Sequence, residues 1–182
     1  VALDAPGNVV AIDSQFVTID DGRLHSYLKW DQAERILTER MTADPADASS
    51  PATLAELAYR ADKPARIVPA ADLAIKALAA APDRDDNRAA RRRLFLALTA
   101  MVNADLDDSR PATPPPGAAA ATADEPRGQK LKDLGLIGQL VDRLALVAQG
   151  PDERVAQKFA AGRLAERRSR AEDAADEYQN VL

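Results

Sequence analysis

The chain has 182 residues, a formal net charge of −5 and a hydrophobic content of 46%, with aromatic residues making up only 4%. The negative charge argues against a general nucleic-acid binder, and the lack of cysteine excludes a disulfide framework, a zinc–thiolate site and a thiol nucleophile. No apolar run approaches the roughly 20 residues that a membrane-spanning helix needs, and the alanine- and leucine-rich composition favours closely packed helices.

Residues 8–28 are the only strand-like part of the sequence. Three runs rich in β-branched or aromatic residues, 9–12, 15–19 and 23–28, predict short strands. Asp20-Asp21-Gly22 stands between the last two runs and predicts a hairpin, because glycine readily takes the positive φ that such a turn requires. Two or three short strands are marginally stable alone in water, so this β piece, assigned to 1–29, needs a partner sheet or the helices.

The β piece resembles part of a blade of a quinoprotein-type (PQQ-like) β-propeller. In that family an acidic strand end and a glycine lead into a strand with a leucine and a tyrosine or alanine, here Gly22, Leu24 and Tyr27. The resemblance covers residues 9–28 and implies a propeller upstream in a longer parent protein. By analogy it implies an exported or cell-envelope location. It does not imply that this fragment binds a quinone, and no cofactor is predicted.

The stretch 30–45 is predicted to form an amphipathic helix. Its apolar residues recur every three to four positions and therefore share one face; they are Ala33, Ile36, Leu37 and Met41. The stretch resembles the second helix of a tetratricopeptide repeat, a family that places an aromatic, a small residue and a closing proline where this chain has Trp30, Ala33 and Pro45. Arg40 replaces the usual second small residue, which marks this copy as degenerate or terminal.

The segment 45–82 has the best fit to a tetratricopeptide repeat. Two helices are expected at about 51–62 and 67–80, and Pro69 is placed in the first turn of the second, where its missing N–H is tolerated. The predicted inner face of that helix comprises Ala70, Leu73, Ala74, Ala77 and Leu78. The small residues of the family pattern match Ala58, Ala70 and Ala77, its closing proline matches Pro82, and Ala65 stands at its turn glycine.

Further helices are predicted on both sides of a proline-rich linker. The first spans about 87–103; Leu94, Leu98 and Met101 line one face of it, and Phe95 and Val102 lie beside them. The linker, 105–129, is predicted to be disordered, because it cannot bury enough surface to offset its ordering entropy. Helices resume at about 130–149, 152–168 and 170–182. In the last pair the residues at the family's small, aromatic and turn positions are Gly162, Ala174, Tyr178 and Ser169.

The predicted fold is therefore mainly α, with antiparallel helix-hairpin repeats of tetratricopeptide type and a small N-terminal β-hairpin or meander. The expected divisions are the β piece at 1–29, helical repeats at 30–104, the linker at 105–129 and further helices at 130–182. The sequence begins abruptly at Val1 and stops at Leu182 inside a predicted helix, so a fragment of a larger protein is expected. The linker leaves two alternatives open: the last helices either pack back on the first repeats or move apart from them.

No constellation of residues predicts catalysis or metal binding. His25, the only histidine, has no nucleophile and no second ligand beside it, so a structural or solvent-exposed role is expected. The acidic pairs Asp20-Asp21 and Asp107-Asp108 lack the oxygen spacing of calcium loops, and the turn and linker interpretations are preferred. No Gly-rich phosphate loop, nucleophile elbow or metal-binding helix motif occurs. The chain is predicted not to be an enzyme.

Partner-binding candidates come from the first helix of each pair, which lines the groove of such repeats. They are Glu56, Tyr59 and Arg60, together with Arg88, Arg91 and Arg92 of an arginine cluster at 88–93. Guanidinium groups on one helix turn bind carboxylates or phosphates. The preferred interpretation of the cluster is a solvated face paired with Asp83, Asp85 and Asp86. A second cluster is interpreted in the same way, with Glu166, Glu172 and Asp173 as neighbours of Arg163, Arg167, Arg168 and Arg170.

The sequence favours a non-enzymatic helical-repeat scaffold that binds an unidentified protein or another domain of its own polypeptide. The alternative is a purely structural spacer between propeller segments of a larger PQQ-like protein. The two hypotheses differ in the groove, which a scaffold offers to a partner and a spacer fills internally, for instance with the linker or the β piece. Neither hypothesis involves a cofactor, a nucleic acid or a membrane span.

Overall fold

The structure is a computed structural model that describes the backbone of residues 8–12, 15–20, 23–107 and 133–180, and the side chains of residues 28–106 and 133–180. Helices dominate these residues, which confirms the prediction of a mainly α chain. They are α1 Trp30–Ala43, α2 Ser49–Arg60, α3 Pro64–Ala80, α4 Asp85–Asp107, α5 Leu134–Val147, α6 Gly150–Arg167 and α7 Ala171–Gln179.

Three strands precede the helices: β1 Asn8–Ile12, β2 Gln15–Asp20 and β3 Arg23–Leu28. They pair antiparallel in the order β1-β2-β3, with Val10 opposite Val17 and Val17 opposite Ser26. The turn residues 21–22 and the side chains of residues 1–27 lie outside the described part of the chain. The interpretation of this segment as a propeller blade therefore stays a prediction.

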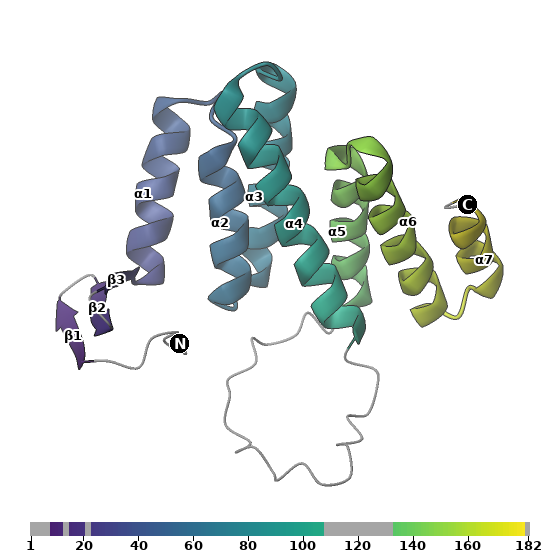
Figure 1. The fold of residues 1–182 in the computed structure, drawn as a ribbon, viewed down its shortest axis with the longest axis horizontal. Coiled ribbons are helices and arrows are strands. Elements are labelled where there is room, and N and C mark those ends of the chain that lie inside the picture. Colours follow the sequence, from purple (N-terminus) through teal and green to yellow (C-terminus); the bar gives the residue numbers. More distant parts are fainter. Residues whose placement is uncertain (1–7, 13–14, 21–22, 108–132, 181–182) are drawn as a thin grey trace, which may run out of the picture.

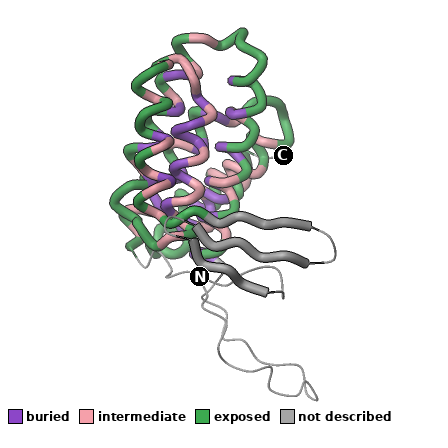
Figure 2. The backbone as a smooth tube through the Cα atoms, turned by 90° about the vertical axis from the view of Figure 1, so that its left-hand side faces the viewer, coloured by how far each residue is buried: buried purple, intermediate pink, exposed green. Residues whose placement is uncertain are grey.

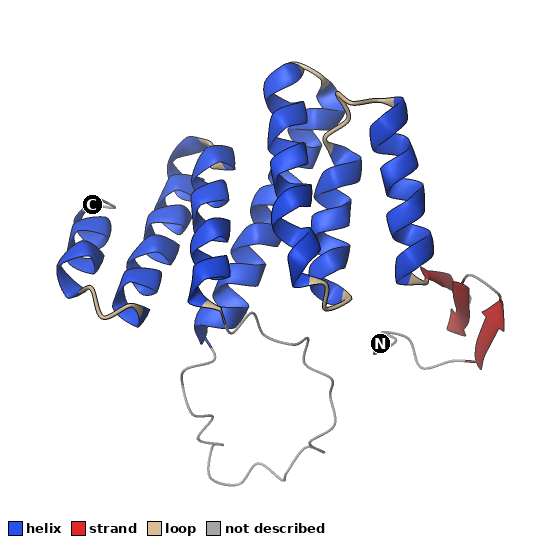
Figure 3. Ribbon diagram, turned by 180° about the vertical axis from the view of Figure 1, so that it is seen from behind, coloured by secondary structure: helices blue, strands red, loops and turns tan. Residues whose placement is uncertain are grey.

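Consecutive helices run in opposite directions, so that α2, α4 and α6 are parallel to one another and antiparallel to α1, α3, α5 and α7 (Figure 1). Contacts between α4 and α6 have a nearly constant sequence separation, from Arg91–Glu153 to Asn103–Arg163 and Leu106–Arg167. A constant separation means that the two helices are parallel. Within the stack α2, α4 and α6 form one layer, and α3 and α5 pack side by side in the other (Figure 3).

The helix α4 joins the two parts of the chain that the predicted linker separates. It packs against α2 and α3 before it and against α5 and α6 after it, and α3 also packs against α5. One hydrophobic core extends from α1 to α6, and the buried residues lie on the helix faces turned toward it (Figure 2). The helices after the predicted linker thus pack back on the helices before it. Residues 108–129 of the predicted linker lie outside the described residues.

The hairpins α2–α3 and α6–α7 turn through the same backbone motif. Asp62 and Ser169 have φ values of 54° and 58°, in the left-handed region. The following residue in each turn donates its N–H to a carbonyl five residues earlier, which is the bond pattern of a Schellman motif. Ser169 stands where the sequence places a turn residue. The predicted turn position Ala65 is wrong, because α3 already begins at Pro64, whose fixed φ suits a first helical position.

Two residues of α3 lie in other places than the sequence predicts. Pro69 lies in the helix interior instead of the first turn, so the carbonyl of Ala65 loses the N–H that it would otherwise receive. Leu73, predicted on the inner face, is 48% exposed. The buried face is centred on alanines and one isoleucine, and Leu73 lies beyond its edge; the buried residues are Ile67, Ala70, Ala71, Ala74 and Ala77.

The helix α4 is longer than predicted at both ends. It begins at Asp85 and continues through Asp107, so residues 105–107, assigned to the linker, are helical. Leu106 is 2% exposed, and Arg167 of α6 donates to its carbonyl at 3.0 Å. Packing against α6 therefore extends the helix past the point where the sequence pattern alone places its end.

The connections α1–α2 and α3–α4 are held together by the side chain of Asn87, which is fully buried. Its Oδ1 accepts a hydrogen bond from the N–H of Ala48 at 3.0 Å, and its Nδ2 donates to the carbonyls of Ala46 and Ala81 at 3.0 and 2.9 Å. One amide thereby satisfies three backbone groups outside the regular helix ladders. The network fixes the start of α2 against the start of α4.

Candidate functional site

An open groove of about 680 Å³ lies between the parallel helices α2 and α4. The end of α2 forms one wall, and a longer stretch of α4 forms the floor and the opposite wall. The residues that line it are Glu56, Tyr59, Arg60, Ala89, Arg92, Arg93, Leu96, Ala97, Ala100 and Met101. Their recurrence every three to four positions along α4 places them on one stripe of that helix.

The floor of the groove is apolar. Ala89, Ala97 and Ala100 carry only a methyl group each, which leaves room above the helix. Leu96 stands among them and is 55% exposed. The floor therefore offers one large apolar side chain, flanked by small ones, that a bound segment can cover.

The rim of the groove is basic. The carboxylate of Glu56 lies 2.7 Å from the guanidinium of Arg60 on its own helix and 2.9 Å from that of Arg93 on α4. Arg92 is exposed, and no ion pair within the described part of the chain involves it. Three guanidinium groups and one carboxylate thus line the groove, which leaves it cationic in a chain whose net charge is −5.

Tyr59 forms part of the groove wall and is half-buried. Burial, and after it the negative charge of Asp105, raises the pKa of the Tyr59 phenol. The hydroxyl therefore stays neutral near physiological pH and keeps its capacity to donate a hydrogen bond.

Four of the six predicted partner-binding residues come together in this groove: Glu56, Tyr59, Arg60 and Arg92. Arg88 does not line it and pairs instead with Asp85 in the exposed first turns of α4. This is the local pairing that the sequence predicts for the arginine cluster. Arg88 is therefore part of a solvated face.

Arg91 packs α4 against α6 and does not line the groove. Its guanidinium lies 2.6 Å from the carboxylate of Glu153 and donates at 2.7 Å to the carbonyl of Val147, the last residue of α5. The hydrogen bond from Arg91 is the main cause that lowers the pKa of Glu153. The side chains of Arg91 and Glu153 are 16% and 15% exposed, which makes the pair a structural contact between helices.

Leu96 and Ala100 line the groove but were not among the predicted binding residues, and Arg93, which also lines it, was predicted only as a member of the arginine cluster at 88–93. The signal that could have found them is the spacing of three to four positions that they share with Arg92. This periodicity defines a stripe along α4. It does not show which other helix lies beside the stripe. The groove forms because α2 lies there and supplies its other wall.

The second arginine cluster also serves mainly in packing. Arg163 donates to the Asn103 side chain at 3.4 Å, Arg167 to the Leu106 carbonyl at 3.0 Å, and Arg168 to a carbonyl at the start of α5 at 2.7 Å. These contacts reach other helices. The sequence predicted instead that the arginines pair with acidic residues close to them in the chain. Arg170 follows that prediction, through an ion pair with Asp173 at 3.1 Å.

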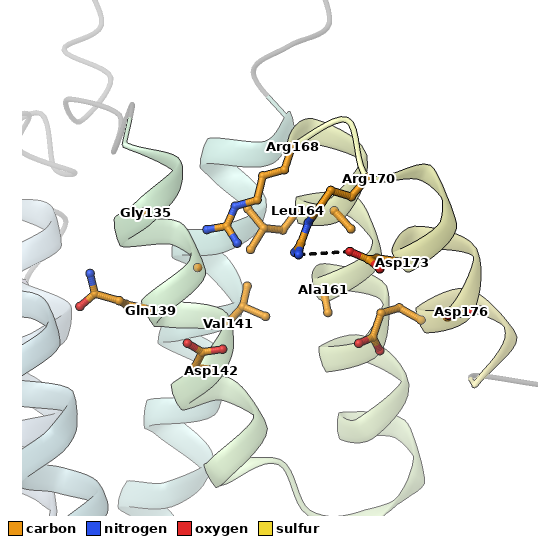
Figure 4. A pocket seen from close by; sticks show the side chains of 13 residues that line it. Gly135, Gln139, Val141, Asp142, Ala161, Leu164, Arg168, Arg170, Asp173 and Asp176 are labelled. Atoms are coloured by element: carbon orange, nitrogen blue, oxygen red, sulfur yellow. Dashed lines mark ion pairs between the residues drawn. The ribbon is translucent and has the colours of Figure 1, made fainter.

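A second hollow of about 480 Å³ lies between α5, α6 and α7 (Figure 4). Arg168 points from the end of α6 toward α5, where it donates to the carbonyl of Leu134. Arg170 faces Asp173, and further acidic side chains of α5 and α7 border the space. Both arginines are thus engaged by the protein itself. The hollow is a weaker binding candidate than the groove, where Arg92 has no such ion pair.

Within the described residues, no group of three or more His, Cys, Asp or Glu side chains could hold a metal ion. No helix in the same part of the chain is long and apolar enough to cross a membrane. The side chains of His25 and of the acidic pairs at 20–21 and 107–108 lie outside the described residues, so the predictions about them stay predictions. Comparisons with protein-family models, curated proteins and solved structures find no match to this chain.

Proposed function

We propose that this chain is a non-enzymatic helical-repeat scaffold that holds a protein segment in the groove between α2 and α4. The segment belongs to a partner protein or to another part of the same polypeptide. The observation that carries the proposal is the groove, an open space of about 680 Å³ with an apolar floor and a charged rim. Binding sites for peptide segments combine these two features, since apolar contacts supply affinity and placed polar groups supply orientation.

The helix arrangement supports a tetratricopeptide-like repeat. Helices alternate in direction, and α2, α4 and α6 lie side by side in the place that first helices take in such repeats (Figure 1). The hairpins α2–α3 and α6–α7 share the same left-handed turn residue, at Asp62 and Ser169. In a repeat of this kind the first helices present a continuous surface to a ligand, which is the surface that contains the groove.

A groove-filling variant tests the proposal. Ala100 is exposed and lines the groove, so Ala100→Trp should fill the groove without disturbing the core. Ala79 is exposed on α3 in the opposite layer, and Ala79→Trp is the matched control. Peptides are selected from a phage-displayed random library against the wild-type chain, and their affinities for all three proteins are then measured.

We expect the selected peptides to bind the wild type and Ala79→Trp equally and to bind Ala100→Trp at least about tenfold more weakly, a loss of roughly 1.4 kcal/mol. Circular dichroism should show the same helix content for the three proteins. Failure to select any peptide, or selection of peptides that bind Ala100→Trp as well as the wild type, would contradict a scaffold function of this groove.

The second candidate function is a purely structural spacer in a larger protein with PQQ-like propeller segments. The ion pairs between successive parallel helices favour it, because Glu34–Arg66 joins α1 to α3 and Asp72–Arg143 joins α3 to α5. Together with the continuous core they hold the helices in one relative arrangement. Two observations would support the spacer. The parent protein would have propeller-like repeats on both sides of this segment, and Ala100→Trp would not change the function of the parent protein.

A further inference from the structure

We propose that the groove between α2 and α4 receives an acidic protein segment with a leucine-sized apolar side chain, and that Glu56 occupies the place of a ligand carboxylate in the free protein. The proposal rests on the proposed scaffold function and names the chemistry of its ligand. It concerns one site, the surface around Glu56, Arg60, Arg92 and Arg93.

The charge of the groove is opposite to the charge of the chain. The whole chain carries a net charge of −5, whereas the charged residues that line the groove are three arginines and one glutamate. A positive surface on an acidic protein attracts an acidic segment selectively and repels a basic one. The apolar floor and the overall negative charge favour a protein segment over a nucleic acid.

The contacts of Glu56 show how a ligand carboxylate would be held. Its Oε1 lies 2.7 Å from Nη2 of Arg60, and its Oε2 lies 2.9 Å from both Nε and Nη2 of Arg93. A carboxylate between two guanidinium groups is the arrangement that arginines provide for acidic ligands. Arg60 and Arg93 remain 68% and 48% exposed, so a second carboxylate can reach them from solvent.

The apolar part of the ligand follows from the neighbouring turn of α4. Leu96 lies one helical turn beyond Arg92, and Ala100 lies one turn further. Leu96 is 55% exposed, and the alanines beside it leave space for a side chain of similar size. A segment whose carboxylates reach Arg92 and Arg93 therefore places an adjacent apolar side chain on Leu96.

Removing the charge of Glu56 should strengthen the binding of the acidic ligand, although Glu56 lines the groove. Neutralising Glu56 releases Arg60 and Arg93 for the ligand and removes a negative charge that repels it. Glu39 is the matched control, because it is an exposed glutamate that pairs with Arg35 four residues away on α1. A loss of charge at Glu39 should leave the groove unchanged.

The experiment measures the affinity of the full chain for three fluorescein-labelled peptides by fluorescence polarisation. One peptide combines glutamates with a leucine at every fourth position, the second has lysines in place of the glutamates, and the third has serines in place of the leucines. The variants are Glu56→Gln with its control Glu39→Gln, and Arg92→Gln with Arg88→Gln, an exposed arginine of α4 outside the groove, as its control. A labelled single-stranded oligonucleotide is the fourth probe.

We expect the glutamate–leucine peptide to bind more tightly than the other probes, and binding to weaken as salt is added. Glu56→Gln should bind it roughly three- to tenfold more tightly than the wild type, and Arg92→Gln more weakly by a similar factor, while both controls match the wild type. Weaker or unchanged binding by Glu56→Gln would refute the role of Glu56. Equal or tighter binding of the lysine peptide or the oligonucleotide would refute the acidic protein ligand.

The result also separates this inference from the scaffold function on which it rests. If library-selected peptides lose affinity for Ala100→Trp but are basic or uncharged, the groove binds protein segments and the acidic ligand is wrong. If no peptide depends on Ala100, the scaffold function itself is wrong. Equal binding of the serine peptide and the leucine peptide would overturn the part of the inference that concerns Leu96.

Discussion

The guanidinium of Arg91 and the carboxylate of Glu153 lie 2.6 Å apart across the contact between α4 and α6. The same guanidinium donates to the carbonyl of Val147, and the same carboxylate accepts from the N–H of Gln149 at 2.7 Å. One ion pair thus fixes the connection between α5 and α6 to the middle of the stack. It joins helices that lie on either side of the predicted linker.

Arg91→Ala should destabilise the fold. The substitution leaves the carboxylate of Glu153 and the carbonyl of Val147, both largely shielded from solvent, without their charged partner. The free energy of unfolding should therefore fall by about 2–3 kcal/mol. The measurement is urea unfolding followed by circular dichroism. The control is Arg88→Ala, whose side chain is 70% exposed and pairs within its own helix, and its unfolding midpoint should match the wild type. Equal midpoints for the two variants would contradict the structural role of Arg91.

Glu153 should make the stability depend on acid. Its pKa in the folded chain is lowered from the usual 4.5, first of all by the hydrogen bond from Arg91. The ionised carboxylate therefore contributes stability above pH 4.5, and that contribution is lost as the pH falls through the depressed value. The stability difference between wild type and Glu153→Gln, measured by urea unfolding at several pH values, should be largest near neutrality and shrink in acid. In an Arg91→Gln background the difference should vary less with pH, because the hydrogen bond from the Gln149 N–H remains. An undiminished pH dependence in that background would assign it to another cause.

Asn87→Ala should be among the most destabilising single substitutions outside the hydrophobic core. It leaves the N–H of Ala48 and the carbonyls of Ala46 and Ala81 without a partner. The free energy of unfolding should therefore fall by about 2–4 kcal/mol. Asn87→Asp should also destabilise, since it points an acceptor at the carbonyls of Ala46 and Ala81. Asn103→Ala, which removes one hydrogen bond at 3.4 Å, is the control and should cost less than about 1 kcal/mol. Similar losses from Asn87→Ala and Asn103→Ala would show that the network contributes little.

Two glycines should respond to alanine with opposite signs. A Cβ at Gly162 would overlap the ring of Tyr178, which packs between α6 and α7, so Gly162→Ala should lower stability by about 1–3 kcal/mol despite better helix propensity. A Cβ at Gly138 would meet the end of the exposed Arg168 side chain, which can move but would give up its hydrogen bond to Leu134, so Gly138→Ala should raise stability by less than about 1 kcal/mol. Thermal unfolding measures both changes, and hydrogen exchange should show faster opening of α7 in Gly162→Ala. Stabilisation by both substitutions would mean that the Tyr178 contact yields easily.

The sequence pattern predicted the buried faces well where a helix has one strong apolar stripe. The residues predicted to line one face of α4 are buried, and so are the two predicted beside them: Leu94, Leu98 and Met101, with Phe95 and Val102. Helical periodicity is a local property, so it can be read without knowledge of the neighbours. In α3 most of the inner residues are alanines, the contrast between the faces is weak, and Leu73 was placed on the wrong side.

The site was predicted only in part, because adjacent arginines on a helix point in different directions. Arg91 and Arg92 are neighbours in sequence, yet one packs against α6 and the other lines the groove beside α2. A cluster in the sequence is therefore divided among different partners in the fold. The choice depends on which helices flank α4, and that is determined by tertiary packing.

The helices α4 and α5 are adjacent in space although residues 108–133 separate them in sequence. Closing a loop costs entropy, but the cost grows only with the logarithm of the loop length, so a doubling adds about 0.6 kcal/mol. The contact between α4 and α5 is therefore almost insensitive to the length of the connection. This makes the connection a place where evolution, or a protein engineer, can add or remove residues while the order of helices and their shared core are preserved.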